Sequence, residues 1–276
     1  DHLASLLLNP DGEDQQALRA GRRYVPRLER APAPSVTPPL ALDPQASYLI
    51  TGGLGALGLE VARWLVEHGA RHLILIGRRG LPTDEATSAE TCAAIEALKQ
   101  QSTSVHIRAT DITDRADMEA LAGFIKQLDA PLRGVIHAAG VSIPTLLAQL
   151  DVDTMQAVLA AKVWGTQRLY TAIQQQPIDF VVFTSSIAAT WGSKGLAHYA
   201  AANHFLDVFA AALRGSGIPA FSLAFGPLQG RGMAHMDSDS WLERSGLTAV
   251  PTSVALAALE NAICSEMPPT VVASVD

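Results

Sequence analysis

Short apolar runs alternate with longer stretches of helical periodicity from residue 47 to residue 276. Several of the runs are apolar almost throughout, which is typical of strands buried on both faces of a parallel sheet. The pattern therefore predicts an α/β fold with a doubly wound parallel sheet of seven strands, a Rossmann fold. The expected strands are YLIT, HLILIG, VHIRAT, GVIHAAG, DFVVFTSS, PAFSLAFG and PTVVASV, and the expected helices are 57–68, 84–100, 114–128, 151–174, 198–214 and 252–264.

Residues 1–33 do not follow this alternation. They read as a short helix, a polar turn, and a final strand and its exit at Tyr24, Val25 and Leu28, too little to form a core alone. The segment 34–46 is rich in proline, which disfavours a helix and favours an extended linker. We expect a catalytic domain over 47–276. Because the chain begins at Asp1 within an apolar pattern, we expect it to be cut from a longer polypeptide.

Composition and charge exclude several classes of protein. The 276 residues are 48% hydrophobic with a formal net charge of −7, so no basic stripe is available for a nucleic acid. No apolar run reaches the roughly 18 residues of a membrane span, and no signal peptide is recognisable. Cys92 and Cys264 lie far apart in helical stretches, so we expect reduced packing residues, no metal site and a cytoplasmic location.

The first strand leads into a glycine turn and then a helix. Gly53, Gly55 and Gly58 have the spacing G-x-G-x-x-G, which lets the backbone approach a dinucleotide pyrophosphate at the helix N-terminus. A tight turn without a ligand is the alternative. Twenty residues after Gly58, where NAD enzymes carry an acidic residue, stand Arg78 and Arg79. A guanidinium there suits the 2′-phosphate of NADPH, and a solvated surface pair is the alternative.

Further cofactor contacts are expected at the ends of later strands. Asp111 and Ile112 are placed to meet the adenine edge, and HAAG, residues 137–140, ends the fourth strand beside the cofactor. His137 is expected to be a packed or backbone-bonded residue rather than a proton donor. The complete predicted cofactor set is Thr51, Gly53, Leu54, Gly55, Leu57, Gly58, Arg78, Arg79, Asp111, Ile112, Ala138, Ala139, Gly140, Lys162, Tyr199, Gly226 and Pro227.

Two hydroxyls are expected to face the nicotinamide. Ser186 ends the fifth strand, thirteen residues before Tyr199, so a ketone bound there would accept hydrogen bonds from both. Free tyrosine has a pKa of about 10, which an ammonium within a few ångströms lowers by roughly 1 to 3 units. Four residues after the tyrosine, where simple short-chain dehydrogenases carry that lysine, stands Asn203. Lys162, in a mostly apolar helix, is the candidate, and an ordinary polar helix face is the alternative.

The span 47–276 resembles the catalytic subdomain of a ketoreductase from a modular type I polyketide synthase, within the short-chain dehydrogenase superfamily. In that family the lysine and the asparagine have exchanged places, so the resemblance implies a catalytic set of Lys162, Ser186, Tyr199 and Asn203. Residues 1–30 likewise resemble the last portion of the family's truncated structural subdomain. The motifs that carry the resemblance are TGGLGALG, GRRG, HAAG, Lys162 followed by GT, FTSS, HYAAAN and FGPLQGRGMA.

The resemblance implies a reaction. The β-carbonyl of an acyl thioester accepts hydride from NADPH, Tyr199 protonates the forming alkoxide and Ser186 stabilises its charge. Lys162 keeps the tyrosine acidic and feeds the proton relay through the cofactor ribose and water, and Asn203 orients that relay. It also implies that the substrate arrives on the phosphopantetheine arm of an acyl carrier protein, beside neighbouring synthase domains.

Two features match the A-type members of the family, which make an L-configured β-hydroxyl. Trp191 lies eight residues before Tyr199, and residues 142–144 read Ser-Ile-Pro where B-type members carry Leu-Asp-Asp. The alternative for Trp191 is that it is a wall residue of the site that only packs against the loop. Leu196 matches neither the glutamine nor the histidine that separates the A subtypes.

The stretch 226–247 is irregular and contains Met233. It is read as a mobile lid with Met233 on the acyl chain, or as a loop without substrate contact. The expected substrate residues are therefore Trp191, Leu196 and Met233. Two other functions stay open: a non-catalytic ketoreductase-like scaffold, which the complete tetrad opposes, and a free-standing dehydrogenase or sugar epimerase, which the Lys/Asn exchange and the proline linker oppose.

Overall fold

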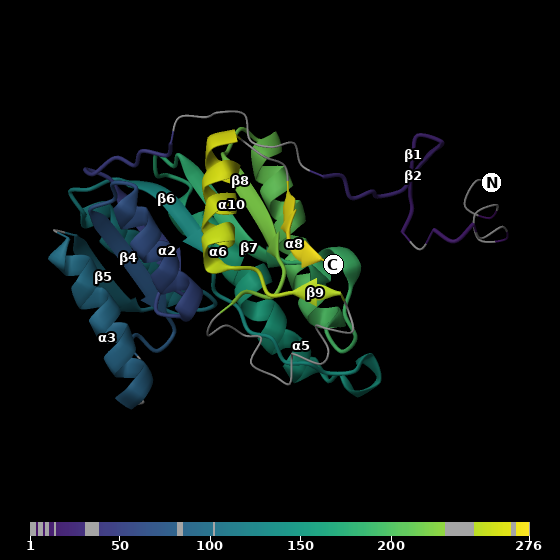
Figure 1. Cartoon of the computed structure of the whole chain (residues 1–276), viewed down its shortest axis with the longest axis horizontal. Coiled ribbons are helices and arrows are strands. Elements are labelled where there is room, and N and C mark those ends of the chain that lie inside the picture. The colour runs from purple at the N-terminus through teal and green to yellow at the C-terminus, as the bar shows by residue number, and fades with distance from the viewer. Residues whose placement is uncertain are drawn as a thin grey trace. The chain divides into compact units, whose positions relative to one another are not determined.

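The structure is a computed structural model that describes Ala4, Leu8 and residues 11–13, 15–30, 39–81, 85–101, 103–229, 246–265 and 269–275. The chain divides into two compact units, Asp1–Ser35 and Val36–Asp276. The second unit consists of one central sheet with helices packed on it (Figure 1).

The central sheet is the predicted one. Its seven strands are ordered β10-β8-β7-β6-β3-β4-β5 and every neighbouring pair is parallel. All seven predicted strands are confirmed, so the Rossmann prediction is right. The strands are β3 (Ser47–Thr51), β4 (His72–Gly77), β5 (Ser104–Ala109), β6 (Leu132–His137), β7 (Phe180–Ser186), β8 (Ala220–Phe225) and β10 (Thr270–Val272).

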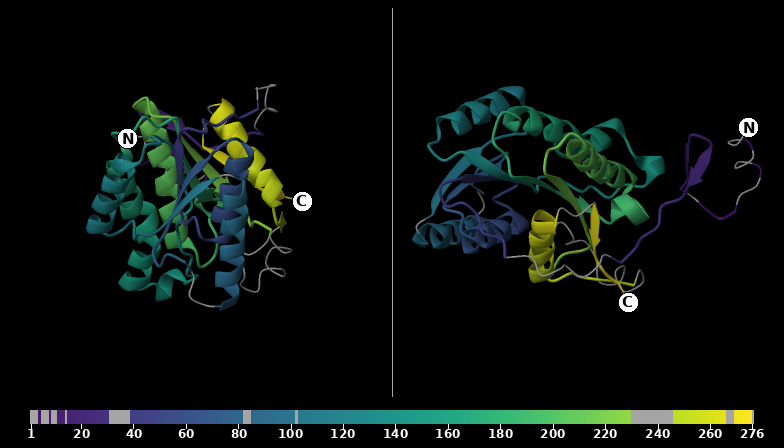
Figure 2. Two further views of the ribbon diagram at one scale, coloured as in Figure 1. Left: turned by 90° about the vertical axis from the view of Figure 1, so that its left-hand side faces the viewer. Right: turned by 90° about the horizontal axis from the view of Figure 1, so that it is seen from above.

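Helices cover both faces of the sheet. On one face lie α2 (Ala56–Glu67), α3 (Glu85–Gln100) and α10 (Thr252–Ser265), and on the other lie α4 (Arg115–Gln127), α6 (Thr166–Ile173) and α8 (Ala197–Gly215). The left view of Figure 2 shows the sheet between these two layers. In β3, Tyr48 and Ile50 pack in the core of the first layer, whereas Leu49 packs in the core of the second. This two-sided burial explains why the strands are apolar at consecutive positions.

The order of the strands indicates at which edge of the sheet a ligand would bind. β3 lies between β4 and β6, so the chain changes the direction of sheet growth at this strand. In such sheets ligands bind beyond the carboxyl ends of the two strands that flank the change. Here those ends are joined directly: the amide of Ala138 donates to the carbonyl of Thr51 at 3.1 Å, and the Thr51 hydroxyl lies 2.5 Å from Nδ1 of His137.

The predicted helix 151–174 is interrupted. It consists of α5 (Val152–Leu159), a π-helical turn η2 (Ala160–Gly165) and α6. The buried positions Val158, Lys162 and Thr166 recur every four residues. A spacing of four is wider than the 3.6 residues of an α-helical turn, and the wider π turn keeps these side chains on the inner face. The Thr166 hydroxyl donates to the carbonyl of Lys162 at 2.7 Å and so bonds a backbone oxygen of this turn.

The first unit contains a β-hairpin where the sequence predicted a single strand. β1 (Ala17–Arg19) pairs antiparallel with β2 (Arg22–Tyr24). The two turn residues, Ala20 and Gly21, both have positive φ. Tyr24 ends β2, and Val25 and Leu28 follow it, where the exit of the strand was expected; Pro26 has no amide hydrogen with which to continue the pairing.

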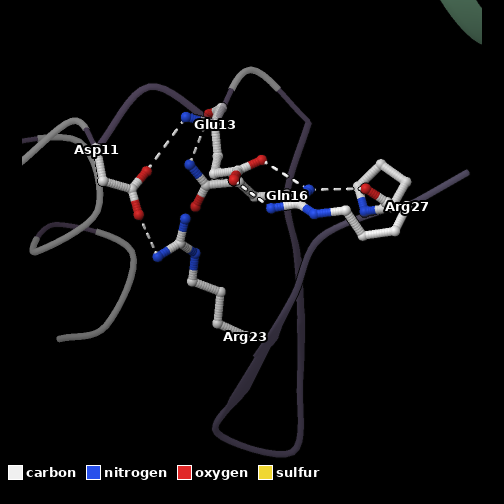
Figure 3. A network of polar contacts seen from close by, with 6 residues as sticks. Asp11, Glu13, Gln16, Arg23 and Arg27 are labelled. Atoms are coloured by element: carbon white, nitrogen blue, oxygen red, sulfur yellow. Dashed lines mark hydrogen bonds and ion pairs between the residues drawn. The ribbon is translucent and has the colours of Figure 1, made fainter.

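Polar contacts link the hairpin to the preceding segment (Figure 3). Arg23 forms an ion pair with Asp11 at 2.5 Å, and Arg27 forms one with Glu13. The side-chain amide of Gln16 donates to the carbonyl of Glu13 at 2.8 Å. All these residues are exposed or half-buried, so the contacts connect the two parts of this unit without forming a core.

Four short elements complete the described structure: η1 (Leu147–Gln149), α7 (Ala188–Trp191), β9 (Leu247–Thr248) and β11 (Ser274–Val275). Cys92 and Cys264 form no disulfide. Cys92 is exposed on α3, so its prediction as a packing residue was wrong, whereas Cys264 is half-buried. Among the described residues no helix is both long and apolar enough to cross a membrane.

Candidate active site

The glycine turn between β3 and α2 is tightly packed on the protein side. A Cβ on Gly58 would lie 2.3 Å from the carbonyl oxygen of Gly52, and one on Gly53 would lie 2.8 Å from that of Ile50. Gly52 itself has a φ of +66°, and a Cβ on it would lie 3.0 Å from the carbonyl group of Ala138. By contrast, Gly55 is exposed and meets only the Gly52 carbonyl, at 3.3 Å. The turn therefore has its open side at Gly55.

The N-terminus of α2 lies at this open side. Gly55 is its N-cap, no side chain caps the helix, and its first turn carries no acidic residue. The first amides of a helix have no partner within the helix and carry partial positive charge. A helix start that is uncapped, free of acidic residues and reached through a glycine fits the pyrophosphate of a dinucleotide.

The predicted 2′-phosphate residues follow β4. Arg78 and Arg79 are both exposed, and neither guanidinium has a hydrogen bond or an ion pair to any described residue. Gly80, next to them, has a φ of +66° and bonds back to the carbonyl of Gly77. The turn thus presents two unpaired guanidinium groups beside the glycine turn, since β3 and β4 are neighbours in the sheet.

The two residues expected at the adenine edge take different positions. Ile112 is buried and packs on Gly165, where a Cβ would lie 2.8 Å from the Ile112 side chain. Asp111 is half-buried, and one of its carboxylate oxygens accepts from both the amide and the hydroxyl of Thr113. Asp111 therefore keeps its second oxygen for another partner, while Ile112 contributes packing and its backbone.

The predicted tyrosine lies in the first turns of α8. Tyr199 is almost fully buried and packs with Ala202 and Val158. Asn203 follows one turn later on the same face and donates to the Tyr199 carbonyl at 2.7 Å. Burial raises the pKa of Tyr199, and hydrogen bonding by the side chains of Asn203 and Ser186 opposes that rise. The structure therefore brings Tyr199, Ser186 and Asn203 together.

The predicted lysine is buried at the same end of the sheet. Lys162 is only 2% exposed, and its ammonium donates to the carbonyl of Thr184 in β7 at 2.9 Å. Its side chain runs along Gly140, where a Cβ would lie 2.6 Å from Lys162 Cε. Burial lowers the pKa of Lys162 to about 8, and the charge of Asp207 opposes this. An ordinary polar helix face, the alternative for this residue, is excluded by its burial.

No hydrogen bond or ion pair joins Lys162 and Tyr199, although the structure describes both side chains. The ammonium faces Thr184, and the groups that act on the tyrosine are Ser186 and Asn203. The expected action of Lys162 on the phenol, with a relay through the cofactor ribose and water, therefore stays a prediction. Oδ1 of Asn203 is buried without a hydrogen-bond partner, which leaves an acceptor free in the same site.

His137 is a packed residue, as predicted. It is fully buried, its Nδ1 contacts the Thr51 hydroxyl, and its ring meets that of Phe183 edge to face. Burial lowers the pKa of His137 to about 3, and the charge of Lys162 lowers it further. The imidazole is therefore neutral near pH 7 and is no proton donor of the imidazolium kind.

Comparisons with known proteins show the family of the chain. The family model for the KR domain matches residues 46–230, more than half of the chain. The chain belongs to the KR domain family. Such domains are ketoreductases, oxidoreductases that reduce β-keto groups in polyketide synthases.

The KR domain is similar to parts of much longer proteins. It is 42% identical over 250 residues to "Erythronolide synthase EryA3" from Saccharopolyspora erythraea, covering 90% of this chain and 8% of that protein. It is 36% identical to "Pikromycin polyketide synthase component PikAIII" from Streptomyces venezuelae, covering 100% of this chain and 17% of that protein. The chain thus spans a small part of these curated relatives.

Solved ketoreductases have the same fold. The ketoreductase from the first module of phoslactomycin biosynthesis in Streptomyces sp. HK803 is 37% identical with a TM-score of 0.85, covering 96% of this chain and 61% of that one. A structure described as A-type ketoreductases from a modular polyketide synthase is 35% identical with a TM-score of 0.86, covering 99% and 57%. A C2-type ketoreductase also reaches 0.84, so the fold alone does not separate the types.

Two loops at the carboxyl end of the KR sheet are tied together. The amide of Thr145 donates to the carbonyl of Gly195 at 2.8 Å, and Nε2 of His198 lies 2.8 Å from the carbonyl of Ile143. The first loop contains the Ser-Ile-Pro sequence of residues 142–144, and the second leads from Trp191 into α8. We call residues 141–147 and 191–198 the paired loops.

The substrate residues expected in this KR domain lie at the paired loops, as far as the structure describes them. Trp191 ends α7 and is 42% exposed, and Leu196 is the N-cap of α8 and packs beside Tyr199. Met233 lies outside the described residues. Gly226 and Pro227 follow β8, where their backbone groups bond Val272 and Val250.

Sequence reasoning missed several KR residues that support the site. Thr184 accepts from Lys162, Gly52 supplies the positive φ of the turn, and Asp207 acts on the charge of Lys162. Asp207 had a recognisable signal, because it lies four residues after Asn203 and so on the same helix face. The backbone acceptor at Thr184 has no signal in the sequence.

Proposed function

We propose that this domain uses NADPH to reduce the β-keto group of a polyketide intermediate on an acyl carrier protein to an L-configured β-hydroxyl. The observation that carries the proposal is the buried ammonium of Lys162, on the Thr184 carbonyl, at the strand ends where Ser186 and Tyr199 also lie. Burying a lysine costs free energy, and titratable groups perturbed by burial cluster at functional sites, so its position favours a catalytic site.

The cofactor proposal rests on the residues that would hold it. The uncapped start of α2 and the open side of Gly55 would receive the pyrophosphate, and Arg78 with Arg79 would bind the 2′-phosphate. Asp111 would accept from the adenine. When bound, the nicotinamide supplies the hydride. The remaining predicted cofactor contacts lie around the same strand ends and stay part of the proposal.

The chemistry assigned to the side chains follows from their positions. Tyr199 donates a proton to the carbonyl oxygen of the substrate, and the hydroxyl of Ser186 donates a second hydrogen bond to that oxygen. Lys162 is the positive charge of the relay that returns a proton to Tyr199. Because Lys162 and Tyr199 share no hydrogen bond, that relay passes through further hydroxyls or water, for which the free Oδ1 of Asn203 is an acceptor.

The L configuration is proposed from the paired loops. Trp191 matches the A-type pattern, and residues 142–144 lack the Leu-Asp-Asp of the B-type. Both segments belong to the paired loops, which the contacts of Thr145 and His198 join into one rim. A rim of fixed shape would admit the acyl chain from one side and so present one face of the ketone to hydride.

The proposal extends to the context of the domain. The similarity to long synthase proteins supports a carrier protein and neighbouring synthase domains as partners. It also supports residues 1–33 as the end of a structural subdomain, 34–46 as its linker and 47–276 as the catalytic domain. Two unpaired cysteines and the proposed cofactor favour a cytoplasmic location.

One experiment tests activity, cofactor and configuration together. The protein is incubated with NADPH or NADH and the N-acetylcysteamine thioester of a racemic 2-methyl-3-oxo acid, and the alcohol is analysed on a chiral column. We expect oxidation of NADPH and a product with the L-configured hydroxyl. A D-configured product would overturn the A-type assignment, and no turnover by a folded protein would favour a non-catalytic scaffold.

Variants separate these roles from simple loss of folding. Tyr199→Phe and Lys162→Met should each reduce kcat by about 10² to 10⁴ while the protein still binds NADPH. Turnover of a free ketone that exceeds turnover of the thioester would instead favour a free-standing dehydrogenase.

A further inference from the structure

Helix α8 carries a third polar side chain on its catalytic face. Asp207 follows Asn203 by four residues and Tyr199 by eight, so the three side chains lie along one side of the helix. Asp207 is half-buried, whereas its neighbours His204 and Val208 are exposed. The proposed reaction gives this carboxylate no part, although it lies next to the site.

The carboxylate is fixed to the sheet below the helix. The hydroxyl of Ser222 in β8 donates to Oδ1 of Asp207 at 2.6 Å, and Ser222 is buried. In β7, the Ser185 hydroxyl donates to the Asn203 carbonyl at 3.2 Å. Burial raises the pKa of Asp207, and the hydrogen bond from Ser222 opposes that rise. Ser222 therefore favours the ionised carboxylate.

Lys162 lies on the same side of the sheet. The turn η2 packs against α8, and the ammonium donates to Thr184, the residue before Ser185. Burial lowers the pKa of Lys162 to about 8, and the group that opposes this is Asp207. No ion pair joins the two, so the interaction acts through space inside the protein, where it is screened less than in water.

The other titratable groups around Lys162 do not replace this charge. His137 is buried and neutral, with its pKa lowered to about 3. Tyr199 is neutral at physiological pH because burial raises its pKa. His204 is exposed and acts on Asp207. Among the described residues, Asp207 is therefore the negative charge that acts on the ammonium.

We propose that Asp207 is a positioning residue for the reduction: its carboxylate, anchored by Ser222, is the counter-charge that keeps the buried ammonium of Lys162 protonated near neutral pH. The inference rests on the proposed role of Lys162 as the charge of the proton relay. It implies that the relay loses its positive charge at a lower pH when Asp207 is neutral.

The first test uses the pH dependence of the reaction in four variants. Asp207→Asn keeps the size and the hydrogen bond from Ser222 but removes the charge, Asp207→Glu restores a charge, and Ser222→Ala removes the anchor. The control is Asp179→Asn. Asp179, just before β7, is an exposed residue whose carboxylate pairs with Arg133. We measure kcat and KM for the thioester between pH 6 and 10 and the melting temperature of each variant.

The expected result is a shift of the alkaline limb of the kcat profile. In Asp207→Asn the pH of half-maximal kcat should fall by about one unit, with KM unchanged. In Ser222→Ala this pH should fall by less. In Asp207→Glu it should lie closer to the wild-type value. Asp179→Asn should superimpose on the wild type. A folded Asp207→Asn whose profile equals that of the wild type overturns the proposal, and if that variant does not fold, an unshifted Ser222→Ala profile overturns it.

A second readout does not depend on activity. The chain has four lysines, and the other three, Lys99, Lys126 and Lys194, are exposed, so lysine labelled with ¹³C at Cε gives four resonances to titrate. The Lys162 resonance, assigned with Lys162→Met, should titrate about one unit lower in Asp207→Asn than in the wild type. Equal midpoints overturn the inference. An inactive wild type with shifted midpoints would instead contradict the proposed function alone.

Discussion

The side chain of Lys162 lies directly against the backbone of Gly140. A Cβ on Gly140 would be 2.6 Å from Cε of Lys162 and 3.3 Å from its Nζ. Carbon atoms do not approach to 2.6 Å without a bond, so any side chain at position 140 must displace the lysine. Gly140, the last residue of the HAAG sequence, was predicted to lie beside the cofactor. The structure adds a second function for this glycine, which is to leave room for the side chain of Lys162.

Gly140→Ala should therefore lower kcat by about 10- to 100-fold, because displacements of about 1 Å in a catalytic group have effects of this size. The measurement is steady-state reduction of the thioester with NADPH. Gly123→Ala is the matched control, since a Cβ at this position in α4 meets nothing within 4 Å. Wild-type kcat in a folded Gly140→Ala would show that the lysine need not occupy this position.

Lys162 should reduce the stability of the protein. Burial lowers its pKa from 10.5 to about 8, so below about pH 8 the folded protein contains a buried charge that the unfolded chain solvates. The shift corresponds to roughly 3 kcal/mol. Lys162→Met should therefore raise the free energy of unfolding at pH 7 by about 1 to 3 kcal/mol, less the hydrogen bond to Thr184.

The gain in the free energy of unfolding that Lys162→Met brings should depend on pH. Between about pH 8 and 10.5 the unfolded chain binds more protons at this residue than the folded protein, so the stability of the wild type rises relative to the variant. Urea unfolding at pH 7 and at pH 10 measures both values. A difference that stays constant with pH would mean that the lysine is not the titrating group.

The rate of reduction should fall in alkaline solution. The proposed relay needs a protonated Lys162, whose pKa is about 8, so kcat/KM should be level below that pH and decline above it. His137 titrates far below this range, with a pKa of about 3, and should leave no acidic limb above pH 5. A pH series with saturating NADPH tests this, and a rate that rises through pH 9 would contradict it.

Two glycines of the dinucleotide turn should respond differently to alanine. At Gly58 the new Cβ would lie 2.3 Å from the Gly52 carbonyl, so Gly58→Ala should lower the melting temperature by several degrees. At Gly55 the nearest atom is 3.3 Å away and the backbone has a φ of −83°, so Gly55→Ala should fold normally.

The two variants differ again in cofactor binding, which fluorescence titration with NADPH measures. Gly55→Ala adds a methyl group at the open side of the turn and should weaken NADPH binding by about 10-fold or more. Unchanged affinity of Gly55→Ala would place the pyrophosphate elsewhere.

Arg78 should distinguish the two nicotinamide cofactors. Its guanidinium has no partner among the described residues, so Arg78→Ala removes no internal contact. We expect KM for NADPH to rise about 10- to 100-fold with KM for NADH nearly unchanged. Arg115→Ala, an exposed arginine paired with Glu119, is the control. Equal effects on the two cofactors would assign Arg78 another function.

The sequence predicted the sheet well because each strand is buried on both faces. β3, for example, places Tyr48 and Leu49 in cores on opposite sides, which no amphipathic helix does. The glycine turn and the pair Tyr199 and Asn203 were also predictable, since both depend on spacing within one local element.

Features that depend on contacts between distant segments were not predictable from the chain alone. The contact of Gly140 with Lys162 joins the end of β6 to the turn η2, and the acceptor of Lys162 is a backbone carbonyl that any residue at position 184 supplies. That Lys162 donates to Thr184 and not to Tyr199 likewise depends on which way one flexible side chain turns. Periodicity predicts which face of a helix a residue occupies, but it does not predict the rotamer of a long side chain on that face.

The π-helical turn at Ala160–Gly165 has a consequence for protein engineering. One added residue rotates everything beyond it by about 100° around the helix axis, and removing it would rotate the inner face of α6 away from the sheet. Moving a lysine of this kind into another Rossmann domain is therefore a problem of chain length as well as of residue identity. A graft that copies the side chain without the wider turn would aim the amine at the wrong neighbour.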